Sequence, residues 1–228
     1  YHLVQVHGFA GTPVGGNSAG PVAAPVAEEL SRYIASEGLK QPAVIGHSMG
    51  GTMGLMLSAR HPEQVSRLMV VDMMPFVGAM FGGPGTTAES IKPRAEAIVA
   101  GMRAQDAAAR QKRIEGTIAG MVDNEAMRPA ALEDSLKSDA EVSSRSYYEI
   151  IVTDLTPELA RITAPVSVLF VVPKGVPLTQ EQMSGFYKAA YAPIKSVKTQ
   201  YFPQAAHFLM WDQPAKFQVE VKAFLTAK

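Results

Sequence analysis

Six consecutive residues determine the predicted fold, Gly46-His47-Ser48-Met49-Gly50-Gly51. They lie between a short apolar segment, residues 42–46, and a segment rich in Met and Leu, residues 53–59. These flanks predict a buried strand followed by a helix. In that context Gly-x-Ser-x-Gly is typical of a sharp turn that exposes a reactive serine. We expect the glycines two positions either side of Ser48 to be required, because side chains there would clash. A glycine-rich turn without chemistry is the alternative.

The segments on either side of this run alternate between strand-like and helix-like patterns. Helices are predicted at about 22–34 and 214–225, and strand-like runs at 1–6, 67–72, 166–172 and about 197–202. Alternation of this kind implies the α/β class, with a mostly parallel sheet covered by helices on both faces.

No strand candidate is present between Asp72 and about Thr156. Instead, alanine-rich amphipathic segments predict helices, around residues 88–104, 106–122, 126–137 and 141–152. We therefore expect residues 1–72 to form the first part of an α/β core, residues 73–155 a helical insertion, and residues 156–228 the second part of the core.

Composition excludes several classes of protein. The 228 residues hold 21 basic and 21 acidic side chains, so no net charge attracts nucleic acid, and 47% hydrophobic residues exclude a disordered chain. The absence of cysteine excludes disulfides and thiolate chemistry but fits either the cytoplasm or the periplasm. No apolar run is long enough to span a membrane. No metal or cofactor motif is evident, and we expect neither.

A serine nucleophile needs a base, and the sequence offers one histidine at a suitable place. His207 lies in the loop between the last predicted strand and the last predicted helix, where it can return over the carboxyl edge of the sheet. His47 lies inside the glycine-rich run and is expected to pack beside Ser48. His2 and His61 are expected to be structural.

These residues resemble the α/β-hydrolase family. The resemblance rests on the run 46–51, on the order Ser, acid, His along the chain, and on the late run Ala206-His207-Phe208-Leu209-Met210-Trp211-Asp212-Gln213-Pro214. It implies that Ser48 is the nucleophile, that His207 is the base, and that residues 73–155 form a helical cap. It covers most of the chain.

The acid of the triad departs from the common family pattern. The segment that usually carries it, residues 172–178, contains no carboxylate. Some members of the family place the acid after the strand that precedes the cap, and that position here is Asp72. We therefore favour Asp72, with Glu181 and Asp154 as the alternatives.

An oxyanion hole takes one backbone N–H from the residue after the nucleophile, which is Met49. The second donor is expected in the loop His7-Gly8-Phe9, with Phe9 as the candidate. Only 48 minus 8, or 40, positions separate Gly8 from Ser48, fewer than the family ordinarily needs. A second interpretation therefore places the oxyanion strand upstream of Tyr1, so that N-terminal strands are absent from this chain.

Methionine and phenylalanine side chains follow Asp72 and bracket the proposed site. Met73, Met74, Phe76 and Met80 are predicted either to line an apolar substrate pocket or to fill the core. The prediction is a serine esterase that acts on small esters with a hydrophobic acyl or aromatic group. The alternatives are a C–C bond or lactone hydrolase of aromatic degradation, and a non-catalytic binding protein. An open sheet edge would favour a homodimer.

Overall fold

The computed structural model describes residues 1–83 and 85–227, so Pro84 within the predicted insertion and the terminal Lys228 lie outside the described residues. Its sheet has four parallel strands in the order β1-β2-β3-β4. The strands are β1 (Ala43–His47), β2 (Arg67–Val71), β3 (Val166–Phe170) and β4 (Val197–Tyr201). All four coincide with predicted strands, and the predicted α/β class is confirmed.

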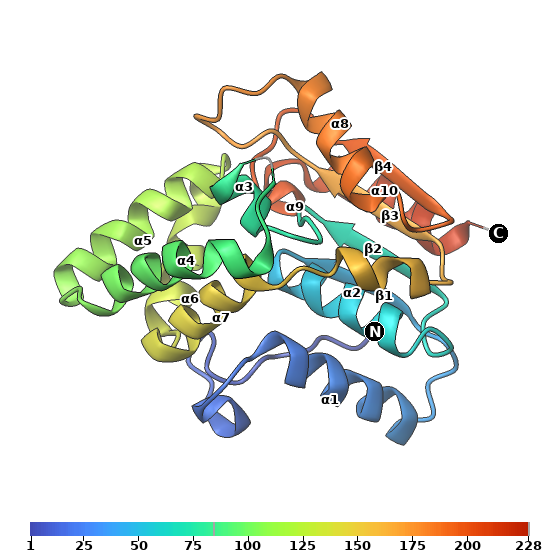
Figure 1. Cartoon of the computed structure of the whole chain (residues 1–228), viewed down its shortest axis with the longest axis horizontal. Coiled ribbons are helices and arrows are strands. Elements are labelled where there is room, and N and C mark those ends of the chain that lie inside the picture. The colour runs from blue at the N-terminus through green and yellow to red at the C-terminus, as the bar shows by residue number, and fades with distance from the viewer. Residues whose placement is uncertain (84, 228) are drawn as a thin grey trace.

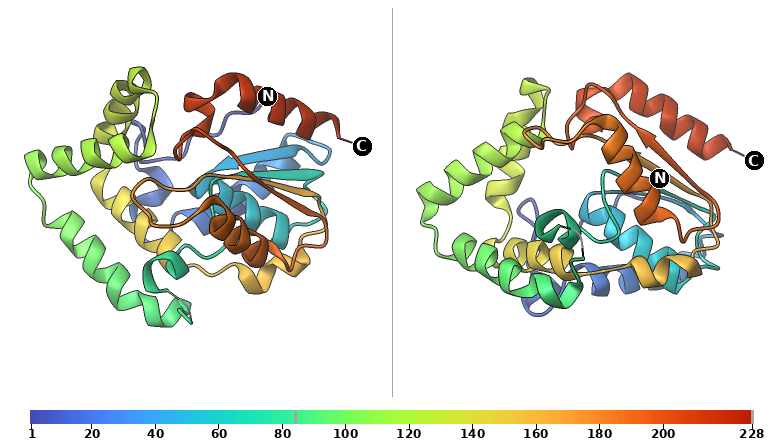
Figure 2. Two further views of the ribbon diagram at one scale, coloured as in Figure 1. Left: turned by 90° about the horizontal axis from the view of Figure 1, so that it is seen from above. Right: turned by 45° about the horizontal axis from the view of Figure 1, so that its top comes forward.

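Helices cover both faces of the sheet, as Figure 2 shows. One face packs against α1 (Ala23–Ser36), α2 (Met49–Arg60), the 3-10 helix η3 (Thr156–Arg161) and α8 (Gln180–Tyr191). The other face packs against α9 (Leu209–Asp212) and α10 (Pro214–Thr226). Alternate residues of β2 turn to opposite faces: Leu68 and Val70 join the first core, and Met69 and Val71 join the second. The sequence did not reveal α8 or α9.

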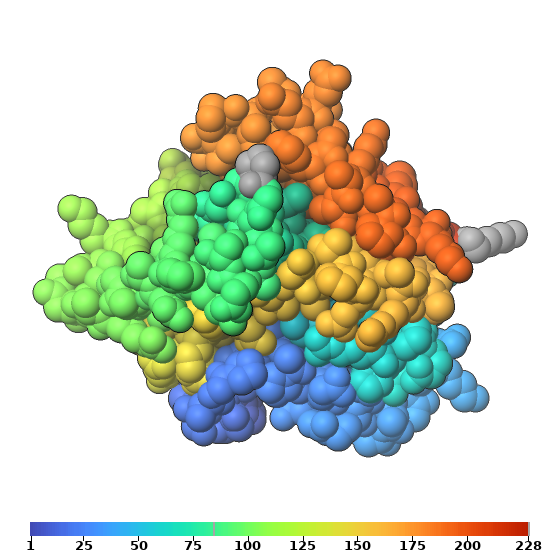
Figure 3. All heavy atoms as spheres, in the orientation of Figure 1, coloured from blue at the N-terminus to red at the C-terminus, as the bar shows by residue number. Residues whose placement is uncertain are grey.

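Among the described residues, five α-helices stand between β2 and β3 in the chain and gather beyond the end of the sheet (Figure 1). They are α3 (Gly78–Gly82), α4 (Ala88–Arg103), α5 (Ala107–Met121), α6 (Arg128–Lys137) and α7 (Ala140–Val152). In the space-filling view their green and yellow surface forms one end of the molecule (Figure 3). The four helices expected between Asp72 and Thr156 correspond to α4, α5, α6 and α7.

A buried carboxylate joins this insertion to the core. Glu149 of α7 accepts hydrogen bonds from the backbone amides of Val22, Ala23 and Ala24, at 2.6, 2.8 and 3.1 Å. These amides lie at the start of α1, where the first turn of a helix has no acceptors of its own and favours a negative charge. The insertion therefore supplies the N-terminal cap of a core helix.

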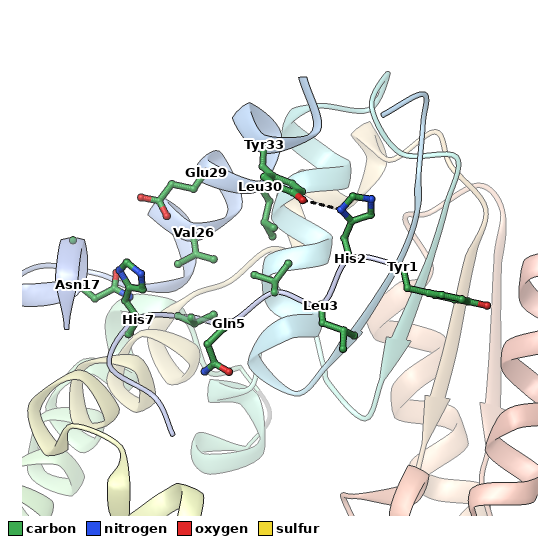
Figure 4. Close-up of a pocket in the computed structure, with 13 residues that line it drawn as sticks. Tyr1, His2, Leu3, Gln5, His7, Asn17, Val26, Glu29, Leu30 and Tyr33 are labelled. Atoms are coloured by element: carbon green, nitrogen blue, oxygen red, sulfur yellow. Dashed lines mark hydrogen bonds between the residues drawn. The ribbon is translucent and has the colours of Figure 1, made fainter. Parts of the chain in front are cut away.

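The strand expected at Tyr1–Val6 is not formed, and that prediction is wrong. The segment is extended but pairs with no strand of the described sheet, and the side chains of Tyr1 and Leu3 are almost fully exposed. Strand propensity is expressed only where a neighbour completes the ladder. Together with α1 and its Tyr33, residues 1–7 enclose a groove of about 620 Å³ (Figure 4).

The register of the sheet places the ends of neighbouring strands side by side. His47 of β1 pairs with Val71 of β2, and Val71 pairs with Leu169 of β3. Because the strands are parallel, the residues that follow them emerge at one edge of the sheet. Ser48 and Asp72 are the first residues beyond β1 and β2.

Candidate active site

Ser48 occupies the turn between β1 and α2 in a strained backbone conformation. Its φ is 52° and its ψ is −124°, a region that residues with side chains rarely adopt. Three backbone hydrogen bonds hold it there: its amide donates to the carbonyl of Val71 at 3.0 Å, and its carbonyl accepts from the amides of Gly51 and Thr52 at 2.7 and 3.3 Å. The turn has the strand–serine–helix geometry expected of this motif.

The glycines around Ser48 are not equally constrained. A Cβ on Gly46 would lie 2.1 Å from the carbonyl oxygen of Gly50, a backbone atom that cannot move aside. A Cβ on Gly50 would meet no atom within 4 Å, whereas one on Gly51 would press on Val70 and Met73 at 3.0 and 3.1 Å. The expectation that both glycines flanking Ser48 are sterically required is therefore correct for Gly46 and wrong for Gly50.

We predict opposite effects of alanine at these two positions. Gly46→Ala should lower the free energy of unfolding by about 3 kcal/mol or prevent folding, because a backbone clash must be relieved. Gly50→Ala, inside α2, should raise it by roughly 0.5 kcal/mol, because alanine favours helix. Urea denaturation followed by circular dichroism measures both. Equal stability of the two variants would contradict the prediction.

Asp72 also has a positive φ, 49°, and its amide donates to the carbonyl of Leu169 at 2.7 Å. Its side chain is only 9% exposed and is surrounded by donors. Oδ1 accepts from the Val171 amide at 3.0 Å and from the Tyr187 hydroxyl at 3.3 Å, while Oδ2 lies 2.6 Å from Nδ1 of His207. Three donors around this carboxyl group hold it in one orientation.

The two rival carboxylates lie elsewhere. Glu181 is exposed in the first turn of α8, and Asp154 accepts a hydrogen bond from the amide of Thr156 within its own turn. Of the three carboxylates considered from the sequence, the structure brings Asp72 alone to His207.

His207 lies in the loop between β4 and α9. Because Asp72 accepts at Nδ1, this nitrogen carries the proton and Nε2 is left as the basic atom. In the part of the chain that the structure describes, neither Nε2 of His207 nor the hydroxyl of Ser48 makes a hydrogen bond. Among these residues the Ser48 hydroxyl and Nε2 of His207 are therefore bonded neither to each other nor to a third group.

Asp212 fixes the loop that carries His207, a role that the sequence analysis missed. Its Oδ2 accepts from the amide of Ala206 at 2.8 Å, and its Oδ1 accepts from the amides of Asp123 and Asn124 at 2.9 and 2.8 Å. These last two residues follow α5, so one carboxylate ties the His207 loop to the insertion. The only sign of this role in the sequence is the position of Asp212, five residues after His207 and two before Pro214.

His47 packs against the ring of His207 with a centroid separation of 4.5 Å. Its Nε2 lies 2.9 Å from the carbonyl oxygen of His207, and since a carbonyl only accepts, Nε2 carries a proton. Burial, and then electrostatic repulsion from His207, lower the pKa of His47 to about 4. His47 is therefore a neutral donor near pH 7 that holds the His207 backbone.

This lowered pKa predicts a pH dependence of stability. Between pH 6.5 and pH 4 the unfolded chain binds a proton at His47 that the folded chain does not, so folding weakens as the pH falls. The loss should reach roughly 3 kcal/mol by pH 4. His47→Gln keeps a side-chain donor but cannot titrate. Urea denaturation across this range should show a shallower pH dependence for the variant, and parallel curves for both proteins would contradict the prediction.

The two proposed oxyanion donors differ in their surroundings. Met49 is the first residue of α2, and among the described residues no acceptor takes its amide. The amide of Phe9, in contrast, donates to the carbonyl of Val6 at 3.3 Å within a local turn. Phe9 therefore stays a prediction as the second donor, and its N–H would have to leave this turn to reach an oxyanion.

The four residues expected to line a pocket do not form one surface. Met73 and Phe76 are buried in two different core clusters, Met74 is half-buried, and Met80 is 50% exposed. The chain leaves β2 and turns inward, which takes Met73 and Phe76 into the core. For these two residues the core interpretation holds.

The described residues contain no group of three or more His, Asp and Glu side chains placed to hold a metal ion. None of their helices has the length and apolarity needed to cross a membrane.

Comparison with known proteins identifies the class. A family model described as the alpha/beta hydrolase family matches residues 1–220, and the chain belongs to that family. An esterase from Exiguobacterium antarcticum superposes with a TM-score of 0.79 at 17% identity, covering 98% of this chain and 80% of that one. The enol-lactonase from Burkholderia xenovorans superposes with a TM-score of 0.72 at 16% sequence identity, covering 97% of this chain and 79% of that one.

Sequence similarity to a curated protein is confined to a short segment. A Yersinia enterocolitica protein that carries the provisional name carbamate hydrolase RutD is 35% identical over 65 residues. The match covers 26% of this chain and 23% of that protein.

Proposed function

We propose that the protein is a serine hydrolase that cleaves carboxylic esters bearing a hydrophobic acyl or aromatic group. The observation that carries the proposal is the 2.6 Å contact between Asp72 Oδ2 and His207 Nδ1, at the same sheet edge as the strained turn of Ser48. A carboxylate, an imidazole and a serine are the parts of an acyl-transfer site. Membership of the hydrolase family supports it.

In this proposal Ser48 Oγ attacks the ester carbonyl carbon while His207 Nε2 takes its proton. The amide of Met49 stabilises the negative charge on the carbonyl oxygen. The C–O bond then breaks, and the imidazolium returns the proton to the departing alkoxide, leaving an acyl group on Ser48. Water, deprotonated by the same imidazole, attacks that acyl group and releases the acid and free Ser48.

Asp72 keeps the proton on Nδ1 and stabilises the imidazolium.

The preference for an apolar group rests on the neighbours of the three reactive residues. Met49 follows Ser48, Met74 comes two residues after Asp72, and Phe208 follows His207, and all three side chains are half-buried. Apolar walls with few polar groups are typical of pockets that bind hydrophobic ligands.

A ligand-binding protein with little turnover is the second candidate, and the committed amide of Phe9 favours it. A hole with one donor would stabilise the transition state less than a hole with two.

Paired acid variants test the proposal through turnover of p-nitrophenyl acetate and butyrate. Asp72→Asn should lower kcat by about 10²- to 10⁴-fold, because the imidazole loses its partner and its tautomer. Glu181→Gln, the matched control, should leave kcat at the parent value. The reverse pattern would make Glu181 the acid, and a parent without an acyl burst whose ligand binding survives Ser48→Ala would favour the binding protein.

A further inference from the structure

Tyr187 lies against Asp72 and has no part in the proton transfers described above. It belongs to α8, its side chain is 5% exposed, and its hydroxyl is 3.3 Å from Asp72 Oδ1. Burial, and then the charge of Asp72, raise the pKa of Tyr187 well above 10. The phenol therefore stays protonated and donates to the carboxylate.

The ring of Tyr187 is held between two other aromatic rings. It stacks on Phe170 of β3 with centroids 4.2 Å apart and an interplanar angle of 13°, and lies nearly parallel to Tyr191 at 6.3 Å. Tyr191 is itself fixed, since its hydroxyl donates to the carbonyl of Met73 at 2.7 Å. This stack leaves the Tyr187 hydroxyl little freedom to point anywhere but at Asp72.

The two donors on Oδ1 decide which way the carboxylate faces. With the Val171 amide and the Tyr187 hydroxyl both on Oδ1, the other oxygen is turned toward Nδ1 of His207. Without the phenol, Oδ1 would keep one donor, the Val171 amide, and only this amide and Nδ1 of His207 would oppose rotation about the Cβ–Cγ bond. Two donors on one oxygen fix the plane of the carboxylate better than one donor does, because each hydrogen bond has its own preferred direction.

We propose that Tyr187 is a positioning residue, whose hydroxyl holds the Asp72 carboxylate in the rotation at which Oδ2 meets Nδ1 of His207. The inference rests on the proposed function only for its effect on turnover. The arrangement of Tyr187, Asp72 and His207 exists without any substrate and can be measured without one.

The chain provides a matched control for the hydroxyl. Tyr187→Phe and Tyr191→Phe each remove one buried phenolic hydroxyl from the same helix and keep the stacked ring. Only the first removes a donor from Asp72, since the second removes the bond to Met73. Effects that come from loss of a buried hydrogen bond alone should appear in both variants.

The first measurement is the proton resonance of the Nδ1–H that His207 shares with Asp72, assigned by its loss in His207→Gln. Tyr187→Phe should shift or broaden this resonance, and Tyr191→Phe should leave it in place. An unchanged resonance in Tyr187→Phe, or the same change in both variants, would overturn the inference. A shifted resonance in a protein that turns over no ester would support Tyr187 while the proposed function failed.

Kinetics give the second measurement. Tyr187→Phe should lower kcat by about three- to tenfold with KM unchanged, and Tyr191→Phe should not. Because Tyr187 acts through Asp72, adding Tyr187→Phe to Asp72→Asn should cost nothing more. Additive losses in the double variant would show that Tyr187 acts by another route and would overturn the inference.

Discussion

The parallel alignment of β1 and β2 is the constraint on which the site depends. It places Ser48 and Asp72 at neighbouring strand ends, and both residues adopt positive φ values at the point where the chain leaves the sheet. The carbonyl of Val71 at the end of β2 also holds the amide of Ser48. A change in register between these strands would separate the proposed nucleophile from its acid, whatever happened to the side chains.

The helical insertion is part of the same arrangement. Two of its residues that follow α5, Asp123 and Asn124, donate their amides to Asp212. The amide of Phe208 donates to the carbonyl of Met121 at 3.0 Å. The ring of Phe208 stacks on Trp211, and both pack against helices α5 and α6. At the far end of the insertion Glu149 caps α1. The loop that carries His207 is thus positioned as much by the insertion as by the sheet, so we expect movement of α5 to move the proposed base.

Features set by local pattern could be predicted from the sequence, and features set by tertiary contact could not. The four paired strands and the long helices of the insertion follow from hydrophobic periodicity. Asp72 was favoured because the resemblance to the α/β-hydrolases implies that the acid can follow the strand that precedes the cap. The predicted strand at residues 1–6 was wrong because a strand forms only beside a partner strand. The prediction that Gly50 is sterically required was wrong because a clash depends on which backbone atoms lie near the glycine in the folded chain. Tyr187 lies on a helix that the pattern did not reveal.

The central claim is that Ser48 is a nucleophile activated by His207 and Asp72. Its most direct test is reaction of the folded protein with a fluorophosphonate probe, which labels serines only when a base activates them, followed by mass mapping of the adduct. We predict one adduct, on Ser48, that is lost in Ser48→Ala. A folded protein that takes no label, or takes it on another serine, would contradict it.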